Sequence, residues 1–175
     1  MNSFVIADPN KCIGCRTCMI ACVVAHNNEN IFEKNIDDIN FNPKLDVIKT
    51  NKVSAPVQCR HCEDAVCVNV CPNGCIVKVK DTIKILEEKC VGCKTCMIAC
   101  PIGAIDLANL KEIDENKLCF KEKMVANKCD LCVESEGGPQ CVKVCPTQAF
   151  KIIKKEDLDI SVKNKRKSAS SRMDF

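Results

Sequence analysis

Cysteines at short, regular intervals are the residues of this sequence whose type and spacing can do chemistry. Cysteine occupies 18 of the 175 positions, and Cys90, Cys93, Cys96 and Cys100 form the run C-x2-C-x2-C-x3-C, followed by Pro101. Three thiolates on one tight loop can wrap three irons of a cubane, while the fourth, already entering a helix, points toward a second cluster. The run therefore predicts a [4Fe–4S] cluster and one-electron chemistry.

The same pattern occurs four times along the chain. Motif one consists of Cys12, Cys15, Cys18 and Cys22, and it has Val23 where the other three motifs have proline. Motif two, with a second gap of four residues, consists of Cys59, Cys62, Cys67 and Cys71, and motif three is the run described above. Motif four, with a second gap of eight residues, consists of Cys129, Cys132, Cys141 and Cys145. All sixteen of these cysteines are candidate iron ligands.

Two cysteines and both histidines fall outside the pattern. Cys75 lies four residues after the last cysteine of motif two, where motifs three and four have alanine, so we expect it to fill a small packing position. Cys119 has no partner at a useful spacing. We expect both to be spectators. Since every motif already has four thiols, His26 and His61 are expected to be polar neighbours of clusters and not ligands.

Disulfides and zinc are the alternative interpretations of so many cysteines. The first residues, MNSFVIADPNKC, show neither the basic start nor the apolar stretch of a signal peptide, and no run reaches the ~18 apolar residues of a membrane span. The sequence therefore predicts a cytoplasmic protein, in which thiols stay reduced and patterned cysteines bind metal. Zinc sites normally close with two C-x2-C pairs, not with three evenly spaced cysteines and a distant fourth.

The segments between the motifs predict a small, loop-rich α+β fold. Short apolar or alternating segments predict strands at 3–7, 45–49, 76–79, 83–86, 103–107 and 150–153, the third and fourth forming a hairpin. Residues 110–128 are predicted to be a linker with a weak helix. The rest of the insertion 23–58 is expected to be surface loop, with partner docking as the alternative. Strand, motif, helix and strand then follow one another twice.

Composition and charge limit the classes of function. With no Trp and no Tyr, a conventional core is thin, and metal is expected to supply stability. The formal net charge is +3, but four clusters at about −2 each would take it to about −5, so the basic figure is no argument for nucleic-acid binding. The basic tail 161–175 is expected to be solvated, or ordered by a partner subunit.

The four motifs together resemble those of the four-cluster iron–sulfur subunits of molybdopterin oxidoreductases. The opening MNSF-x-IAD-x-x-KCIGCRTC and the segments CPNG and ANKCDLC are most similar to the soluble branch in formate dehydrogenases, formate hydrogenlyase and hydrogen-dependent carbon dioxide reductase. The resemblance covers residues 2–158. It implies tandem bacterial two-cluster ferredoxin-like modules, with four [4Fe–4S] clusters that move electrons between catalytic subunits.

Exchange of the fourth ligand between motifs, which the family shares, implies which cysteines share a cluster. The expected sets are Cys12, Cys15, Cys18 and Cys145; Cys129, Cys132, Cys141 and Cys22; Cys59, Cys62, Cys67 and Cys100; and Cys90, Cys93, Cys96 and Cys71. Motifs two and three then form an inner half, 59–101. Motifs one and four form an outer half, 1–58 with 102–160, and the tail 161–175 lies outside both.

The function expected from the sequence is a one-electron relay without a catalytic residue of its own. The resemblance implies a formate dehydrogenase-type molybdopterin or tungstopterin subunit and a hydrogenase subunit as partners. Two alternatives stay open: a freely diffusing polyferredoxin, and a scaffold that joins copies of itself through the tail while conducting electrons. No nucleic acid and no membrane span are expected.

Overall fold

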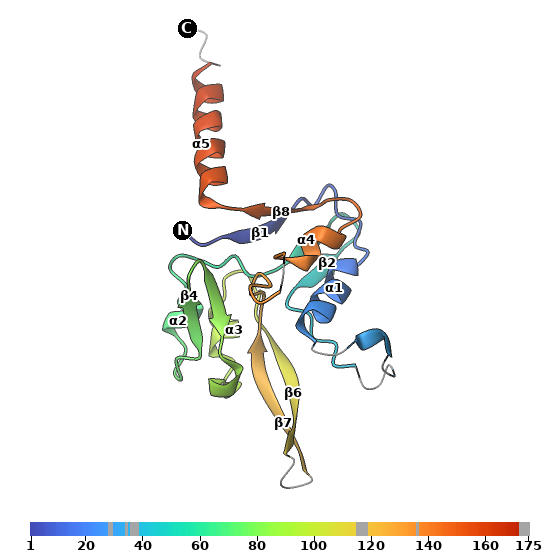
Figure 1. Ribbon diagram of the computed structural model, residues 1–175. Coiled ribbons are helices and arrows are strands. Elements are labelled where there is room, and N and C mark those ends of the chain that lie inside the picture. The colour runs from blue at the N-terminus through green and yellow to red at the C-terminus, as the bar shows by residue number, and fades with distance from the viewer. Residues whose placement is uncertain (28–29, 34, 36–38, 115–118, 136, 172–175) are drawn as a thin grey trace.

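A computed structural model describes residues 1–175 except 28–29, 34, 36–38, 115–118, 136 and 172–175, and it describes only the backbone at the remaining positions of 111–121. In this part of the chain, short helices alternate with four separate pairs of antiparallel strands (Figure 1). The expectation of a small fold of helices and short antiparallel strand pairs is confirmed. No helix in the described part is long and apolar enough to cross a membrane.

The first and last strands of the chain pair with each other. Strand β1, Phe4–Ala7, lies antiparallel to β8, Phe150–Ile153, with Val5 opposite Ile152. Helix α1, Thr17–His26, packs against helix α4, Gln140–Val144. The beginning of the chain, with motif one, is thereby joined to motif four near its end.

Motifs two and three form a second packed unit. Their helices α2, Val66–Asn69, and α3, Thr95–Ala99, contact each other. The hairpin of β4, Ile76–Val79, and β5, Thr82–Ile85, connects the two motifs as predicted, and the 3-10 turn η3, Glu87–Lys89, leads from β5 into motif three. Ile76 and Ile83 are almost fully buried in this unit.

The insertion between motifs one and two contains more structure than predicted. A 3-10 turn η1, Ile31–Glu33, is followed by β2, Asp46–Lys49, which confirms the predicted strand. The partner strand β3, Ser54–Val57, was not predicted, because its run of Ser, Ala and Pro has little strand character. Leu45 and Val47 anchor this hairpin in the core beside Val5.

Two predictions about the second half of the chain are wrong. Residues 110–128, predicted to be a linker with a weak helix, instead contribute to a long hairpin of β6, Asp106–Asp114, and β7, Cys119–Asn127, which projects from the body (Figure 1). The returning strand predicted at 103–107 begins only at Asp106. Buried residues hold the base of this hairpin, because the register places Ala108 opposite Val125 and both are almost fully buried.

The tail is helical in its described part. Helix α5, Lys155–Ser170, has Asp157 in its first turn, and the Asp157 carboxylate accepts a hydrogen bond from the Lys154 amide at 3.0 Å. None of its residues is buried, and it extends away from β8 and the rest of the body (Figure 1). Residues 161–170 of the tail are therefore helical and exposed to solvent.

Candidate iron–sulfur sites

Each motif folds as a tight loop that enters a short helix. In motifs one and three the loop glycines, Gly14 and Gly92, have φ of +67° and +64°. A Cβ at Gly92 would lie 2.6 Å from the carbonyl oxygen of Met124, so glycine also allows β7 to lie directly on the loop of motif three. Both the positive φ and the close approach of β7 favour a residue without a Cβ at this position.

The motif thiols lie in neighbourhoods where cysteines of different motifs come close enough to shift one another's pKa. Burial raises the pKa of the Cys59 and Cys67 thiols, and Cys62 and Cys100 raise both further. Burial likewise raises the pKa of Cys129, Cys132 and Cys141, and Cys22 adds to the rise in all three, with Cys18 adding to it at Cys141. Each of these two neighbourhoods brings cysteines of one motif near the last cysteine of another.

The other two neighbourhoods follow the same arrangement. A hydrogen bond from the Thr17 hydroxyl, at 3.4 Å, lowers the pKa of Cys15, while Cys145 opposes this change. In motif three, a hydrogen bond from Thr95 lowers the pKa of Cys93, and Cys71 opposes it. The lowered pKa favours the thiolate, the form that binds metal, at the two exposed positions.

Buried thiols of the motifs have the opposite property. Burial raises the pKa of Cys18 to about 11 and that of Cys141 to about 12. A thiolate in such surroundings needs a cation to balance its charge, and bound iron would supply one. Two buried thiols, those of Cys90 and Cys96, line an apolar cavity together with Cys71 and Cys93.

Backbone amides point at the sulfurs of the candidate ligands. The amides of Ala104 and Ala149 donate to Cys100 Sγ at 3.4 Å and to Cys145 Sγ at 3.3 Å, and each lies four residues after its cysteine. Further amide donors are Lys44 to Cys22 Sγ at 3.3 Å, His61 to Cys59 Sγ at 3.4 Å, Ala126 to Cys90 Sγ at 3.3 Å and Leu131 to Cys129 Sγ at 3.5 Å. Such bonds stabilise negative charge on sulfur and tune cluster potentials.

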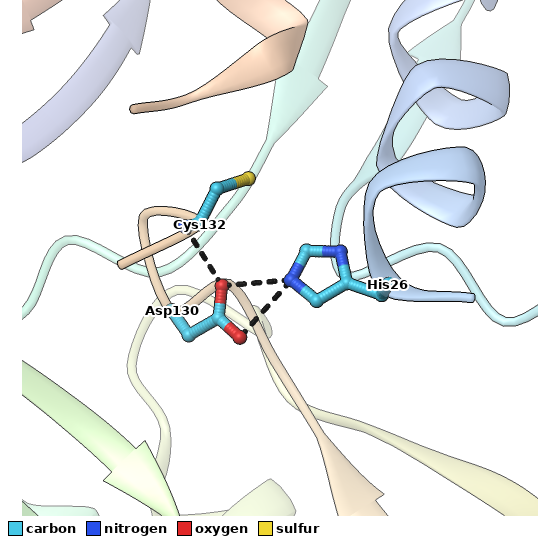
Figure 2. A group of neighbouring side chains, drawn as sticks. All are labelled: His26, Asp130 and Cys132. Atoms are coloured by element: carbon cyan, nitrogen blue, oxygen red, sulfur yellow. Dashed lines mark hydrogen bonds and ion pairs between the residues drawn. The ribbon is translucent and has the colours of Figure 1, made fainter. Parts of the chain in front are cut away.

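Figure 2 shows a polar contact beside the Cys22 neighbourhood. His26 Nε2 lies 3.0 and 3.1 Å from the two carboxylate oxygens of Asp130, which also accepts the Cys132 amide at 2.9 Å. Burial lowers the pKa of His26, but the bonds to Asp130 and Cys22 outweigh it and raise the pKa to about 10. His26 is thus a polar neighbour of candidate ligands, as expected.

These three side chains could hold a metal ion by proximity alone, because their ligand atoms lie within 4.8 Å of one another. However, His26 Nε2 already bonds to both oxygens of Asp130, and the Asp130 carboxylate also lies 3.8 Å from Lys44 Nζ. The arrangement is that of an ion pair joining α1 to motif four. We assign no separate metal site to it.

Cys75 lies closer to the candidate ligands than the sequence suggested. Its buried Sγ is 3.3 Å from Cys71 Sγ, and burial together with this contact raises its pKa to about 12. Its amide also donates to Cys71, as Ala104 and Ala149 do in their motifs. Cys119 belongs to β7, but its side chain lies outside the described residues.

Two buried residues lie beside the motifs: Lys128, which sequence reasoning missed, and His61, which was expected to be a polar neighbour of a cluster. Lys128 is 3% exposed, and its Nζ donates to the carbonyl oxygen of Cys129 at 2.9 Å. His61 is 1% exposed and accepts the Ile83 amide on Nδ1 at 3.0 Å; burial and the charge of Lys128 lower its pKa to about 3. The signal in the sequence was the position of Lys128, directly before the first cysteine of motif four.

Comparisons with known proteins define the class. Two segments, residues 83–106 and 9–24, match family models described as 4Fe-4S binding domains. The chain is 43% identical over 173 residues to electron transport protein HydN of Escherichia coli strain K12, covering 97% of this chain and 98% of that protein. It is 35% identical over 196 residues to hydrogenase-4 component A of the same strain, covering 98% and 92%.

The chain therefore belongs to the family of ferredoxin-like iron–sulfur electron-transfer proteins that includes HydN. A third relative, putative electron transport protein YsaA of E. coli K12, is 42% identical over 151 residues, covering 86% of this chain and 88% of that protein. Two of the three relatives, HydN and YsaA, are named as electron transport proteins, which confirms the expectation of a non-catalytic electron-transfer protein. Among solved structures, a chain of the active site complex BamBC of benzoyl coenzyme A reductase matches at 18% identity with a TM-score of 0.42, covering 98% of this chain and 90% of that one.

Proposed function

We propose that the protein carries four [4Fe–4S] clusters and relays single electrons between a formate dehydrogenase-type molybdopterin or tungstopterin subunit and a hydrogenase subunit. The observation that supports the proposal is that motif thiols form neighbourhoods in which cysteines of two motifs come close, as Cys100 does to Cys59 and Cys22 does to Cys129. Bound there, the clusters supply carriers of one electron each.

The ligand sets that we propose follow these neighbourhoods. They are Cys12, Cys15, Cys18 and Cys145; Cys129, Cys132, Cys141 and Cys22; Cys59, Cys62, Cys67 and Cys100; and Cys90, Cys93, Cys96 and Cys71. The chemistry of the donors fits the group: thiols of different motifs come close, backbone amides point at their sulfurs, and eight of the sixteen are buried.

The proposed division into an inner half, 59–101, and an outer half, 1–58 with 102–160, has support from packing. Helices α2 and α3 contact each other in the inner half, while α1 and α4 do so in the outer half, where β1 also pairs with β8. The buried side chains form two clusters of similar extent. The hairpin of β6 and β7 belongs to the outer half by sequence but contacts motif three of the inner half.

Metal content tests the cofactor. Anaerobically prepared protein should hold about 16 irons and about 16 acid-labile sulfides with negligible zinc. Stoichiometric zinc with little iron would contradict the proposal. EPR of the reduced protein should count four clusters, and loss of one cluster from Cys145→Ala with the other three retained would support the exchange of fourth ligands.

The proposed partners rest on the relatives. One is named hydrogenase-4 component A, and the sequence motifs resemble those of formate-converting complexes. Native purification from the source cells should recover the chain, in the cytoplasmic fraction, in a fixed ratio with a molybdopterin or tungstopterin subunit and a hydrogenase subunit. Recovery as a lone brown protein would instead support a freely diffusing carrier.

Helix α5 favours a fixed subunit, one that could also join copies of itself. It extends 16 residues without a buried side chain, and an isolated helix of this length is marginal in water. A partner surface would stabilise it, and its basic residues would make that contact sensitive to salt. Deleting 161–175 should leave all four clusters and their EPR signals unchanged but reduce the particle size measured by light scattering. An unchanged particle would make the tail a bystander.

A further inference from the structure

Lys128 is a buried cation at the junction of two candidate cluster sites. Lys128 directly precedes motif four, and its side chain reaches the hairpin of β4 and β5 between motifs two and three. Its Nζ donates to the carbonyl oxygen of Ile83 in that hairpin and, at 2.9 Å, to the carbonyl oxygen of Cys129 in motif four. Only 3% of the residue is exposed. The ammonium group is therefore held in a fixed place and is almost completely removed from water.

The charge of Lys128 has no carboxylate partner among the described residues. Four carboxylates line the polar cavity that Lys128 also borders. Three of them bind other cations, and the fourth, Glu88, makes no ion pair with Lys128 in the described part of the chain. Asp130 is bound by His26 and Lys44, Glu134 pairs with Lys84, and Glu87 lies 3.8 Å from Lys44. Burying an ion without a counter-charge is costly, so this arrangement requires negative charge from another source.

The thiols of motif two are within electrostatic reach of Lys128. Ile83, whose carbonyl oxygen accepts from Lys128 Nζ, donates its amide to His61 Nδ1 at 3.0 Å, and the His61 amide donates to Cys59 Sγ at 3.4 Å. Burial raises the pKa of Cys59 and Cys67, and Lys128 acts against this rise at both. Under the proposed function, these two thiols belong to a [4Fe–4S] site whose four thiolates and 2+ core carry a net charge of about −2. Such a site offers the missing counter-charge.

We propose that Lys128 is the internal counter-ion of the cluster site formed by Cys59, Cys62, Cys67 and Cys100, and that its charge raises the reduction potential of that cluster. The inference rests on the proposed function. Reduction adds one electron to this site, makes or breaks no bond and moves no proton to Lys128. Because the product is more negative than the reactant by one charge, a fixed cation stabilises it more.

The test is a potentiometric titration, followed by EPR, of full-length holo-protein carrying Lys128→Met. Iron content should stay at about 16 per chain, while one of the four clusters becomes harder to reduce. At a fixed potential its ratio of reduced to oxidised form should fall at least about tenfold, which is 59 mV for a one-electron couple. Because the charge is buried, the shift should persist in 1 M salt.

Lys123 supplies the matched control. Its Nζ also donates to two backbone carbonyls, those of Glu87 and Glu88, both at 3.0 Å, but at a more exposed position. Lys123→Met also removes an ammonium group that donates to two backbone carbonyls. At high salt it should leave the reduction potentials of all four clusters unchanged within the error of the titration. An equal shift from Lys123→Met would overturn the assignment to a buried charge.

Further outcomes separate this inference from the proposed function. Full iron with unchanged potentials in Lys128→Met overturns the inference alone, whereas wild-type protein without [4Fe–4S] clusters overturns both. If Lys128→Met loses iron, the Lys128→Arg variant decides whether Lys128 acts through its charge or only as a structural anchor. Full iron and the wild-type potential in Lys128→Arg support the role of charge, and loss of iron in both variants would make Lys128 a structural anchor only.

Discussion

Motifs one and three have nearly the same sequence but different structures. GCRTCMIAC and GCKTCMIAC begin alike, with Arg16 and Lys94 both left-handed at φ of 61° and 68°. They differ in the length of the helix that follows: α1 has ten residues and α3 has five. Pro101 disfavours helical backbone at Cys100, which is extended, whereas Val23 lets α1 continue through Cys22.

The longer helix changes what surrounds the fourth sulfur. After Cys100 the chain leaves the helix and the Ala104 amide turns back to Cys100 Sγ. The residue at the same place after Cys22 is His26, whose amide lies inside α1 and bonds within the helix. Lys44, from the insertion, supplies the amide to Cys22 Sγ. The residue directly after the motif thus decides whether the amide that donates to the fourth sulfur comes from four residues further along the chain or from a distant segment.

Among the changes that test the comparison of motifs one and three, removal of iron should have the largest effect on the protein. Acid and chelator should abolish the native circular dichroism of the body, because structural metal sites supply much of the folding energy in small domains. Trypsin can cleave after Arg16 and Lys94, which hold equivalent places in the two motifs. During iron loss, cleavage after Lys94 should come first, since α1 retains its ion pair to motif four. A well-folded apo-protein would contradict the dependence on metal.

Val23→Pro should make motif one resemble motif three at the level of structure. Proline inside α1 removes a helix hydrogen bond and clashes with the preceding turn, a cost of about 3 kcal/mol or more. The midpoint of thermal unfolding should fall accordingly. The reciprocal change, Pro101→Val, should cost less than about 1 kcal/mol, chiefly through the entropy of the unfolded chain. Equal effects of the two substitutions would show that the following residue does not determine the helix.

Asp130→Asn should weaken the ion pair between Asp130 and His26, the last residue of α1, for which the shorter α3 has no counterpart. Losing a hydrogen bond between charged groups costs about 1.5–3 kcal/mol, so iron loss to a chelator should accelerate about tenfold or more. Asp8→Asn is the matched control, because Asp8 also accepts an amide two residues ahead at 2.9 Å but has no histidine partner. If both variants accelerated iron loss to a similar degree, the ion pair between His26 and Asp130 would not be the cause of the acceleration.

Cys75→Ala should have the smallest effect. It recreates at motif two the alanine that motifs three and four have, and Cys71 keeps the amide bond from residue 75. Iron content should stay at about 16 per chain, with only a small change in the potential of one cluster from the lost thiol contact at 3.3 Å. Ala104→Cys, the converse substitution, should leave iron content unchanged as well. Loss of four irons from Cys75→Ala would instead identify Cys75 as a ligand.

Predictions from the sequence succeeded where short-range rules act. The strands at Ile76–Val79 and Phe150–Ile153 follow apolar patterns, and the positive φ at Gly14 and Gly92 follows from the tight loops. The candidate ligands could be named from spacing alone. Their allotment to four clusters rests on the exchange of fourth ligands and stays a prediction.

The failures come from contacts between distant parts of the chain. The hairpin of β6 and β7 was missed because its charged residues suggested solvent, although its register places the buried Ala108 opposite the buried Val125. The role of Asp130 depends on His26, which is 104 residues away. Burial of Lys128 depends on Ile83, and no local pattern indicates that a lysine is enclosed. Residue types alone could not reveal these pairings.

The pairing of β1 with β8 has a consequence for the order of events on the ribosome. Residues 4–7 are made well before their partners, 150–153. Motifs two and three can meet as soon as residue 101 and the strands beside it have left the tunnel. Under the proposed ligand sets, the cysteines of motif one, by contrast, stay reduced and unpartnered until Cys145 has been made. Maturation of the proposed outer half is thus coupled to synthesis of residues 145–153, and a product truncated before them would expose motif one without its closing strand.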